Sequence, residues 1–283
     1  MHGMDFSLPA ELLDYIRDLD AFIDREIKPL QARDDNNRFF DHRREHARTD
    51  WERGGLPRDE WEELLRQAAH LADKAGFYRL SLPTEYGGRD DGNGRNSNLW
   101  MAVIREHLAS KGLGLFNDLQ NEHSVVGNFP DVLMLRHFGT PEQKEKLIWG
   151  RLNGKVRITF GLTEPRHGSD ATHMETRAVK ETRDSVEGWR INGSKKWQTG
   201  MHKATHCFIF ARTSGRNGDI KGVTCFIVPK ETPGLKVESY EWYVEQLTGL
   251  HSENSSVSNC LGSPPDCCSL ESEPLTAMSH HCS

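Results

Sequence analysis

Apolar residues recur at steps of three and four along much of the first half of the chain, which is the period of an amphipathic helix. The first such run begins after Pro9 and ends near Pro29, and its apolar positions are Leu12, Tyr15, Ile16, Leu19, Phe22, Ile23 and Ile27. A second run follows Pro57 and ends at Gly76, a residue type that often terminates helices. These runs predict two helices, each with one buried face.

Further helices are predicted before residue 155. One surrounds Ile104 and stops before Gly112, and another covers residues 132–138. Residues 140–143 have the composition of a capping box, which predicts a helix that continues to about Leu152. Residues 1–155 are therefore predicted to form an N-terminal all-α helical domain.

The segment between the first two helices, residues 33–53, is rich in charge and has little periodicity. Its basic residues Arg43, Arg44, His46 and Arg48 could form a patch that binds anions. The composition favours a solvated connection instead, because runs of charge are usually exposed to solvent.

From Val156 onward the apolar period changes to two, which is typical of strands. Residues 156–163 form the first strand candidate, and the others are 176–180, 188–196, 205–213, 222–229 and 235–240. Short strands separated by turn residues predict a small antiparallel β-barrel or sandwich over residues 156–242. The expected fold class is α+β.

Residues 243–283 show neither helical nor strand periodicity and are rich in serine. We expect an irregular, disordered tail that is unrelated to the preceding domains. A metal cluster could be proposed from the late cysteines and histidines Cys260, Cys267, Cys268, Cys282, His280 and His281. No CxxC pair is present, so we predict no metal site.

Composition narrows the function classes. The 283 residues carry a formal net charge of -6, which gives no basic excess for nucleic acid. The mean hydropathy is -0.68, and no apolar run approaches the roughly 18 residues that a membrane span needs, so we expect no membrane insertion. The first 30 residues resemble neither a signal nor a transit peptide, which favours the cytoplasm and leaves peroxisomal or mitochondrial placement open.

The candidate chemistry lies in residues 157–200. Two strands there end in hydroxyl, glycine and aromatic residues, the first at Thr163–Asp170 and the second at Lys195–Gly200. Short hydroxyl side chains at strand ends can bind ring heteroatoms, and an indole face such as that of Trp197 suits a large planar ligand. We predict that both strand ends belong to one ligand site.

Four motifs in register resemble the acyl-CoA dehydrogenase family. They are Leu82–Gly88, Phe138–Lys144, Leu162–Asp170 and Asn192–Trp197. The resemblance covers roughly residues 8–242 and implies a helical domain followed by a β middle domain. In the family, a C-terminal four-helix domain completes the flavin and substrate sites, and we expect no such domain in this chain.

The resemblance implies FAD-dependent α,β-desaturation of an acyl-CoA thioester. The cofactor-binding residues implied are Phe160, Leu162, Thr163, Ser169, Trp197 and Thr199. Trp197 would pack against the isoalloxazine, and Thr199 would lie near N5. Ser169 would contact both the flavin diphosphate and the pantetheine arm of the acyl-CoA substrate. The resemblance also implies a homo-oligomer in the complete protein.

Several departures from the family pattern leave alternatives open. Arg166 and His167 stand where family members usually have small residues. The family's catalytic carboxylate lies in the C-terminal domain, beyond Trp242 here, and Glu164 belongs to a turn, so no catalytic residue is assigned. One alternative is an inactive, truncated fragment that binds flavin or forms dimers. Another is a nitroalkane-oxidase-like flavoenzyme, which would use an aspartate as its base.

Overall fold

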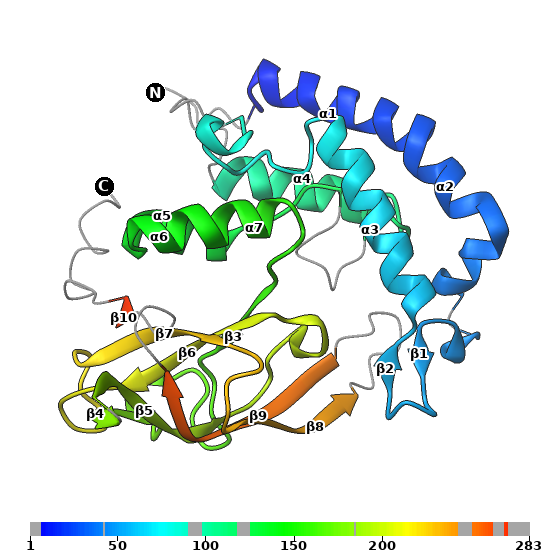
Figure 1. Ribbon diagram of the computed structural model, residues 1–283. Coiled ribbons are helices and arrows are strands. Elements are labelled where there is room, and N and C mark those ends of the chain that lie inside the picture. The colour runs from blue at the N-terminus through cyan, green and yellow to red at the C-terminus, as the bar shows by residue number, and fades with distance from the viewer. Residues whose placement is uncertain are drawn as a thin grey trace, which may run out of the picture. The chain divides into compact units, whose positions relative to one another are not determined.

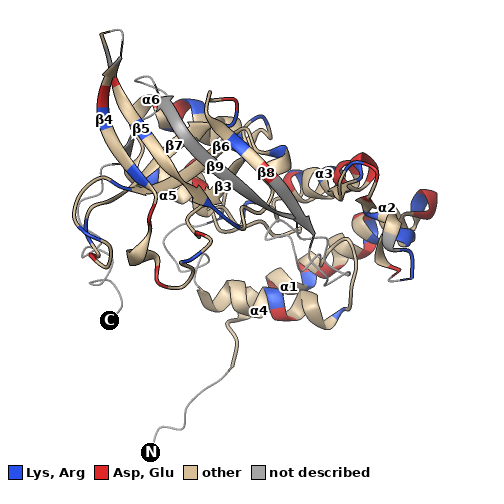
Figure 2. Cartoon of the chain, turned by 90° about the horizontal axis from the view of Figure 1, so that it is seen from below, with Lys and Arg blue, Asp and Glu red and all other residues tan. Residues whose placement is uncertain are grey.

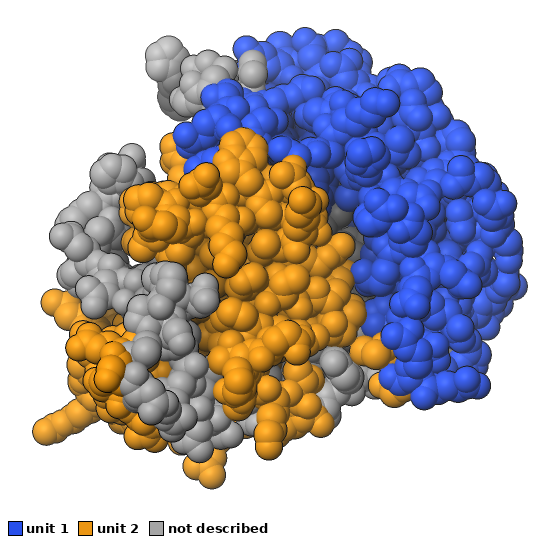
Figure 3. Space-filling model, viewed as in Figure 1, with its two compact units in different colours: residues 1–53, 57–129, 245–249 blue, residues 54–56, 130–244, 250–283 orange. Residues whose placement is uncertain are grey.

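The computed structural model describes residues 7–41, 43–89, 98–117, 125–183, 185–242, 251–262 and 269–270. The chain divides into two compact units, coloured separately in Figure 3. Unit 1 comprises residues 1–53, 57–129 and 245–249, and unit 2 comprises the remainder. The domain boundary that the sequence suggests at residue 155 stays a prediction.

The first predicted helix is present and longer than expected. Helix α1 (Ala10–Phe22) continues through a π-helical turn, Ile23–Ile27, into α2 (Lys28–Ala32) (Figure 1). Helical geometry therefore passes Pro29, the second residue of α2. The π-helical turn just before α2 already interrupts the regular hydrogen-bond ladder, and proline is tolerated in the first turn of a helix. Most of the predicted apolar face is buried: Leu12, Tyr15, Leu19, Phe22, Ile23 and Ile27.

Helices α3 (Asp59–Lys74) and α4 (Asn98–Ser110) contribute the other main faces of the unit 1 core. The ring of Tyr15 lies 5.5 Å from that of Phe77 and 5.9 Å from that of Trp100, measured between centroids. Acidic and basic residues are interspersed along α1 and α3 (Figure 2). The helical period thus correctly predicts which side chains meet in the core.

The connection between α2 and α3 is more ordered than its composition suggests. It contains the 3-10 turns Arg33–Phe40 and Glu45–Ala47 and a two-stranded pair of β1 (Thr49–Asp50) and β2 (Leu56–Pro57). Arg48 is 7% exposed, and its guanidinium lies 4.1 Å from the centroid of the Trp61 ring. Arg48 is therefore a core contact and does not belong to an exposed basic patch.

Three short helical segments precede the sheet in unit 2: α5 (Pro130–Phe138), α6 (Pro141–Gln143) and α7 (Trp149–Leu152), with a π-helical turn between the last two. The predicted capping box is confirmed. The backbone N–H of Gln143 donates to Thr140 Oγ1 at 3.3 Å, and the backbone N–H of Thr140 donates to Gln143 Oε1 at 2.9 Å. These bonds occupy donors that a helix start otherwise leaves unpaired.

All six predicted strands are present in an eight-stranded sheet (Figure 1). They are β3 (Ile158–Gly161), β4 (Arg177–Arg183), β5 (Val186–Lys195), β6 (His206–Arg212), β7 (Val223–Pro229) and β8 (Leu235–Trp242). Two further strands, β9 (His251–Gly262) and β10 (Ser269–Leu270), complete the sheet. The order is β10-β7-β6-β4-β5-β9-β8, with β3 beside β6. The α+β fold class is confirmed.

Most strand pairs are antiparallel, as predicted, but β3 and the first residue of β4 both pair with β6 in parallel. The chain between β3 and β6 forms the β4–β5 hairpin, which is long enough for the crossover that a parallel pair requires. Gly161 lies opposite Ile209, and Arg177, the first residue of β4, lies opposite Arg212. The loop of residues 162–176 therefore leaves from and returns to the same edge of β6.

The expectation of an irregular tail is wrong for the part that the structure describes. Residues 251–262 form β9, which pairs antiparallel with both β5 and β8, and Ser269–Leu270 form β10, which pairs with β7. Strand pairing uses backbone groups that every non-proline residue carries, so a polar segment without periodicity can still add to a sheet. The other predicted tail residues lie outside the described ranges.

None of the helices in the described ranges is both long and apolar enough to cross a lipid bilayer. The two described cysteines outside the tail, Cys207 and Cys225, are buried free thiols.

Replacing Thr140 with alanine removes the hydroxyl that receives the Gln143 N–H. We expect the free energy of unfolding to fall by about 1 kcal/mol, the usual cost of losing an N-cap side chain. Urea unfolding followed by circular dichroism measures the change. Thr140→Ser retains the hydroxyl and should stay close to wild type; an equal loss in both variants would exclude the cap as the cause.

Candidate functional site

The two strand ends singled out in the sequence meet in the structure. The backbone N–H of Lys196 donates to the Thr163 carbonyl at 2.9 Å, which joins the segment after β5 to the segment after β3. A second bond, from Thr159 Oγ1 to the Thr199 carbonyl, is 2.9 Å long. These bonds hold segments 160–163 and 196–199 side by side. The residues of the two segments that are at least partly accessible form the candidate surface: Phe160, Leu162, Thr163, Lys196, Trp197 and Thr199.

A buried ion pair lies directly beneath this surface. Lys195 Nζ is 2.7 Å from Glu164 Oε1, and the two side chains are 1% and 3% exposed. Lys195 Nζ also donates to the Leu162 carbonyl at 3.2 Å. The Glu164 carboxylate receives the backbone N–H groups of Glu175 at 2.6 Å and Thr176 at 3.0 Å. One carboxylate and one ammonium thus hold both ends of the 162–176 loop and the end of β5.

The protonation of this pair follows from its surroundings. Burial by itself would raise the pKa of Glu164, but the hydrogen bonds from Lys195, Thr176 and Glu175 outweigh it and leave the pKa below the ordinary value of 4.5. Burial lowers the pKa of Lys195, and the contact with Glu164 opposes that effect. Glu164 is therefore ionised at neutral pH and anchors the 162–176 loop through its bonds to Lys195, Glu175 and Thr176. That it is no catalytic base stays a prediction.

Trp197 has an unusual backbone conformation for a large residue. Its φ is 68°, in the left-handed region that costs a non-glycine residue about 1–3 kcal/mol. Its side chain is 39% exposed, and Lys196 Nζ lies 4.2 Å from the ring centroid. Strain of this kind persists where neighbouring contacts enforce it, and here the Lys196–Thr163 bond precedes the strained residue directly.

The β3 side of the surface is aromatic. Phe160 is half-buried, and its ring centroid lies 5.4 Å from that of Phe208 and 6.0 Å from that of Phe210. Leu162 and Thr163 are also half-buried, whereas Thr199 is exposed. The predicted residues other than Ser169 therefore present partly accessible apolar and hydroxyl groups on adjacent segments.

Gly193 is required by a close approach of β5 to the returning loop. A Cβ at this position would lie 2.2 Å from Thr176 Oγ1 and 2.6 Å from Thr176 Cα. The sheet register shifts between Ile191 and Gly193, as expected for a bulge at a crowded point. The glycine of the Asn192–Trp197 motif therefore allows the backbone of Thr176, which binds Glu164, to pack against the strand that carries Lys195.

Ser169 differs from the other five predicted residues because no hydrogen bond links it to them in the described part of the chain. It is also exposed. The turn before it is closed by the backbone N–H of Glu164, which donates to the His167 carbonyl at 2.9 Å. The turn after it is fixed by Asp170, which accepts from the backbone N–H of Thr172 at 3.1 Å. The ligand-binding role of Ser169 stays a prediction.

The large residues that depart from the family pattern form a cluster beside this turn. The His167 and His173 rings are stacked with centroids 5.9 Å apart, and both Arg166 and His167 lie within 3.7 Å of a Glu175 carboxylate oxygen. His173 Nδ1 is 2.7 Å from Asp170 Oδ2. Arg166 remains largely exposed, with 79% of its side chain accessible.

Two buried cations escaped the sequence analysis. Lys195 was assigned only to a motif, and Arg212 only to the end of a strand. Arg212 is 1% exposed and donates to the carbonyls of Thr172, Ser214, Asp219 and Lys221 at 2.6–3.3 Å. The sequence offers one signal for a buried Lys195: it lies at the end of a predicted strand, and a glutamate, Glu164, directly follows another predicted strand. The sequence carries no comparable signal for Arg212.

No group of three or more histidine, cysteine or acidic side chains within the described ranges is arranged to hold a metal ion. Of the tail residues considered for a metal cluster, all except Cys260 lie outside those ranges. The accessible groups of the candidate surface include hydroxyls, backbone groups and aromatic rings.

Comparison with protein families identifies the chain. Residues 30–155 match the model "Acyl-CoA dehydrogenase, N-terminal domain", and residues 159–250 match the model "Acyl-CoA dehydrogenase, middle domain". The chain belongs to the acyl-CoA dehydrogenase family. The second match contains all six predicted site residues: Phe160, Leu162, Thr163, Ser169, Trp197 and Thr199.

Individual relatives agree with this family membership. The chain is 27% identical over 271 residues to glutaryl-CoA dehydrogenase of Desulfococcus multivorans, covering 93% of this chain and 60% of the relative. It is 30% identical over 178 residues to 3-(aryl)acrylate reductase of Clostridium sporogenes, covering 62% and 43%. This acyl-CoA dehydrogenase family member thus spans about half the length of the curated relatives it matches.

A solved structure shares the fold. Glutaryl-CoA dehydrogenase from Mycobacterium smegmatis, determined in complex with FADH2, superimposes with a TM-score of 0.62 and 23% identity, covering 95% of this chain and 58% of that one. At this identity the likeness concerns the fold.

Replacing Glu164 with glutamine tests the buried anchor. We expect a loss of about 3–5 kcal/mol in the free energy of unfolding at neutral pH, because the change leaves the Lys195 ammonium buried without its charged partner. Urea unfolding at neutral pH measures the loss. Glu187→Gln changes an exposed carboxylate of the same sheet and serves as the control. Similar losses in both variants would contradict an anchoring role.

The same pair predicts a pH dependence. Because the folded-state pKa of Glu164 is depressed below 4.5, its stabilisation is complete above about pH 4.5 and is lost as the pH falls through the folded-state value. The free energy of unfolding of the wild-type chain should therefore decline as the pH falls below about 4.5. The decline should be shallower in Glu164→Gln, and parallel profiles would exclude Glu164 as a source.

Proposed function

We propose that residues 160–199 form the isoalloxazine-binding part of an FAD-dependent acyl-CoA dehydrogenase. The observation that carries this proposal is the bond from the Lys196 N–H to the Thr163 carbonyl. It brings the half-buried Thr163 next to the partly exposed indole of Trp197. A planar polar ring system needs this combination of an aromatic face and hydrogen-bonding groups at its edge.

The residues present fit a flavin by their chemistry. Phe160 and Trp197 offer apolar ring surface, and Thr163 and Thr199 offer hydroxyls that can donate to or accept from ring heteroatoms. The positive φ of Trp197 turns the chain directly after β5, so its indole is held partly exposed instead of buried in the sheet. In this proposal Trp197 packs on the flavin and Thr199 lies near N5.

When bound, FAD accepts the hydride that leaves the β-carbon of an acyl-CoA. This chain's residues orient the ring and exclude water from its face. In the proposal, Ser169 contacts the flavin diphosphate and the pantetheine arm of the substrate from its exposed turn. The Glu164–Lys195 pair does not move a proton; it positions Thr163 and the segment that carries Trp197.

The substrate class and assembly also belong to this proposal. Relatives carry names that refer to acyl-CoA substrates, such as glutaryl-CoA dehydrogenase and the short-chain acyl-CoA dehydrogenase of Megasphaera elsdenii. We infer an acyl-CoA thioester as substrate and a homo-oligomer as the assembled form of the whole protein. Light scattering coupled to size-exclusion chromatography measures the latter.

The proposal predicts that the purified 283-residue chain binds FAD. Its visible spectrum should show a protein-bound flavin. Bleaching of this spectrum when an acyl-CoA is added under anaerobic conditions would show in addition that the chain carries out the reductive half-reaction of a dehydrogenase. Bound flavin without bleaching would support the alternative of an inactive flavin-binding fragment. Bleaching with a nitroalkane instead would favour the nitroalkane-oxidase-like alternative. A protein that binds no flavin would overturn the proposal.

A matched pair of tryptophans tests the ring-packing role. Trp197 and Trp149 are 39% and 46% exposed, so truncating either removes a partly exposed indole of unit 2. We expect Trp197→Ala to weaken FAD binding about tenfold or more, the value of one good aromatic stacking contact. Trp149→Ala should leave binding unchanged. Titration of FAD fluorescence decides, and equal effects of the two changes would remove Trp197 from the flavin site.

A further inference from the structure

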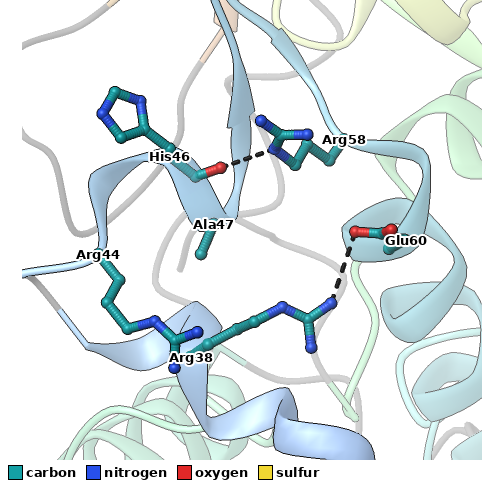
Figure 4. Close-up of a pocket in the computed structure, with 6 residues that line it drawn as sticks. All are labelled: Arg38, Arg44, His46, Ala47, Arg58 and Glu60. Carbon is teal, nitrogen blue, oxygen red and sulfur yellow. Dashed lines mark hydrogen bonds and ion pairs between the residues drawn. The ribbon is translucent and has the colours of Figure 1, made fainter.

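A basic pocket lies in unit 1, in the segment that the sequence favoured as a plain connection. It has a volume of about 410 Å³ and is lined by Arg38, Arg44, His46, Ala47, Arg58 and Glu60 (Figure 4). Three of these six residues are arginines, and a fourth is a histidine. None of them belongs to residues 160–199, so an inference from this pocket is independent of the flavin proposal.

The pocket's basic residues differ from the patch that the sequence suggested. Arg48 points into the core, and Arg43 makes a two-pronged ion pair with the carboxylate of its neighbour Asp41 at 2.8 and 2.9 Å. Arg44 and His46 remain from that set. Arg38 and Arg58 join them from the two flanking segments, and only the fold brings these four together.

Main-chain carbonyls hold two of the arginines in place. Arg38 Nη1 donates to the carbonyls of Asp34 at 3.1 Å and Asp35 at 3.2 Å, and its guanidinium lies 4.2 Å from the Phe39 ring centroid. Arg58 Nε donates to the His46 carbonyl at 2.7 Å (Figure 4). Guanidinium groups fixed in this way lose little conformational freedom when a ligand binds, which favours affinity.

The positive charge of the pocket is incompletely balanced. Arg44 pairs with Asp35 at 2.9 Å, and Arg38 reaches Glu60 at 3.5 Å, which is long for a charged hydrogen bond. Within the described residues, no carboxylate pairs with the Arg58 guanidinium, whose bond to His46 uses only Nε. Three guanidinium groups thus share two carboxylates, and Glu60 is the weaker partner of the two.

The start of α3 adds to this potential. Arg58 is the N-cap residue of α3, a helix of 16 residues, and no side chain caps that helix start. A helix N-terminus carries partial positive charge and presents N–H groups to anions. Asp59, Glu60 and Glu62 lie in this first turn, and of these three carboxylates Glu60 alone lines the pocket, where it competes with a bound anion.

We propose that this pocket binds the phosphate or diphosphate group of a small molecule. A phosphate group offers several charged oxygens to guanidinium forks at once, which a single carboxylate does not. Arg58 supplies its Nη groups, which pair with no carboxylate in the described part of the chain, and Arg38 exchanges its long contact with Glu60 for the ligand. The volume of about 410 Å³ exceeds one phosphate and falls within the range of small-molecule sites, roughly 300–1,000 Å³.

Calorimetric titration of pyrophosphate into the full chain at low salt tests the proposal. The wild type should bind with a 1:1 stoichiometry, and Arg58→Gln should weaken the affinity about tenfold or more. Glu60→Gln should tighten it severalfold, because the change removes the carboxylate that competes for Arg38. A gain of affinity cannot arise from a misfolded variant, so this second change protects the test against loss of structure in the first.

Two controls match these changes in type. Arg43→Gln removes an exposed arginine that neighbours the pocket segment without lining it, and Glu63→Gln removes a carboxylate of α3 that pairs with Arg66. Both should leave the affinity unchanged. Parallel titrations with ADP distinguish a nucleotide-borne diphosphate from the free ion. Absence of 1:1 pyrophosphate binding, an Arg43→Gln effect equal to that of Arg58→Gln, or unchanged affinity in Glu60→Gln would each overturn the proposal.

Discussion

The buried ion pair between Glu164 and Lys195 is the contact on which the candidate site depends. An unpaired charge in a protein interior is costly, so each partner confines the other, and both also engage backbone groups of the 162–176 loop. The loop already leaves from and returns to one edge of β6. The ion pair ties the end of β5, which Trp197 follows by two residues, to the same loop.

The elements of the fold were largely predictable because local rules decide them. Apolar spacing identified the buried face of α1, and the capping box at Thr140 identified the start of α6. Period-two alternation located the strands from β3 to β8. Strand β9 was missed because its pairing is made by backbone groups, and its sequence has no apolar alternation that would reveal it.

The candidate site was predictable only in part. Motifs placed Thr163 and Trp197 together, but a sequence does not show that Lys195 turns inward to a carboxylate from another strand end. Arg48 illustrates the same limit in unit 1, where a residue in a charged segment packs on Trp61. Buried cations depend on partners distant in sequence, and local composition carries no information about them. The pocket around Arg58 depends likewise on the fold, which brings the connection before α3 and the start of α3 together.

The central claim is that the Glu164–Lys195 pair positions the flavin-binding surface. The most direct measurement is the FAD dissociation constant of the wild-type chain and of the double variant Glu164→Gln/Lys195→Met. Circular dichroism first establishes that both proteins are folded under the conditions of the titration. The double variant removes both charges and so avoids a lone buried ion. The account predicts saturable binding by the wild type and a clearly higher dissociation constant in the folded double variant. Equal dissociation constants, or no FAD binding by the wild type, would contradict it.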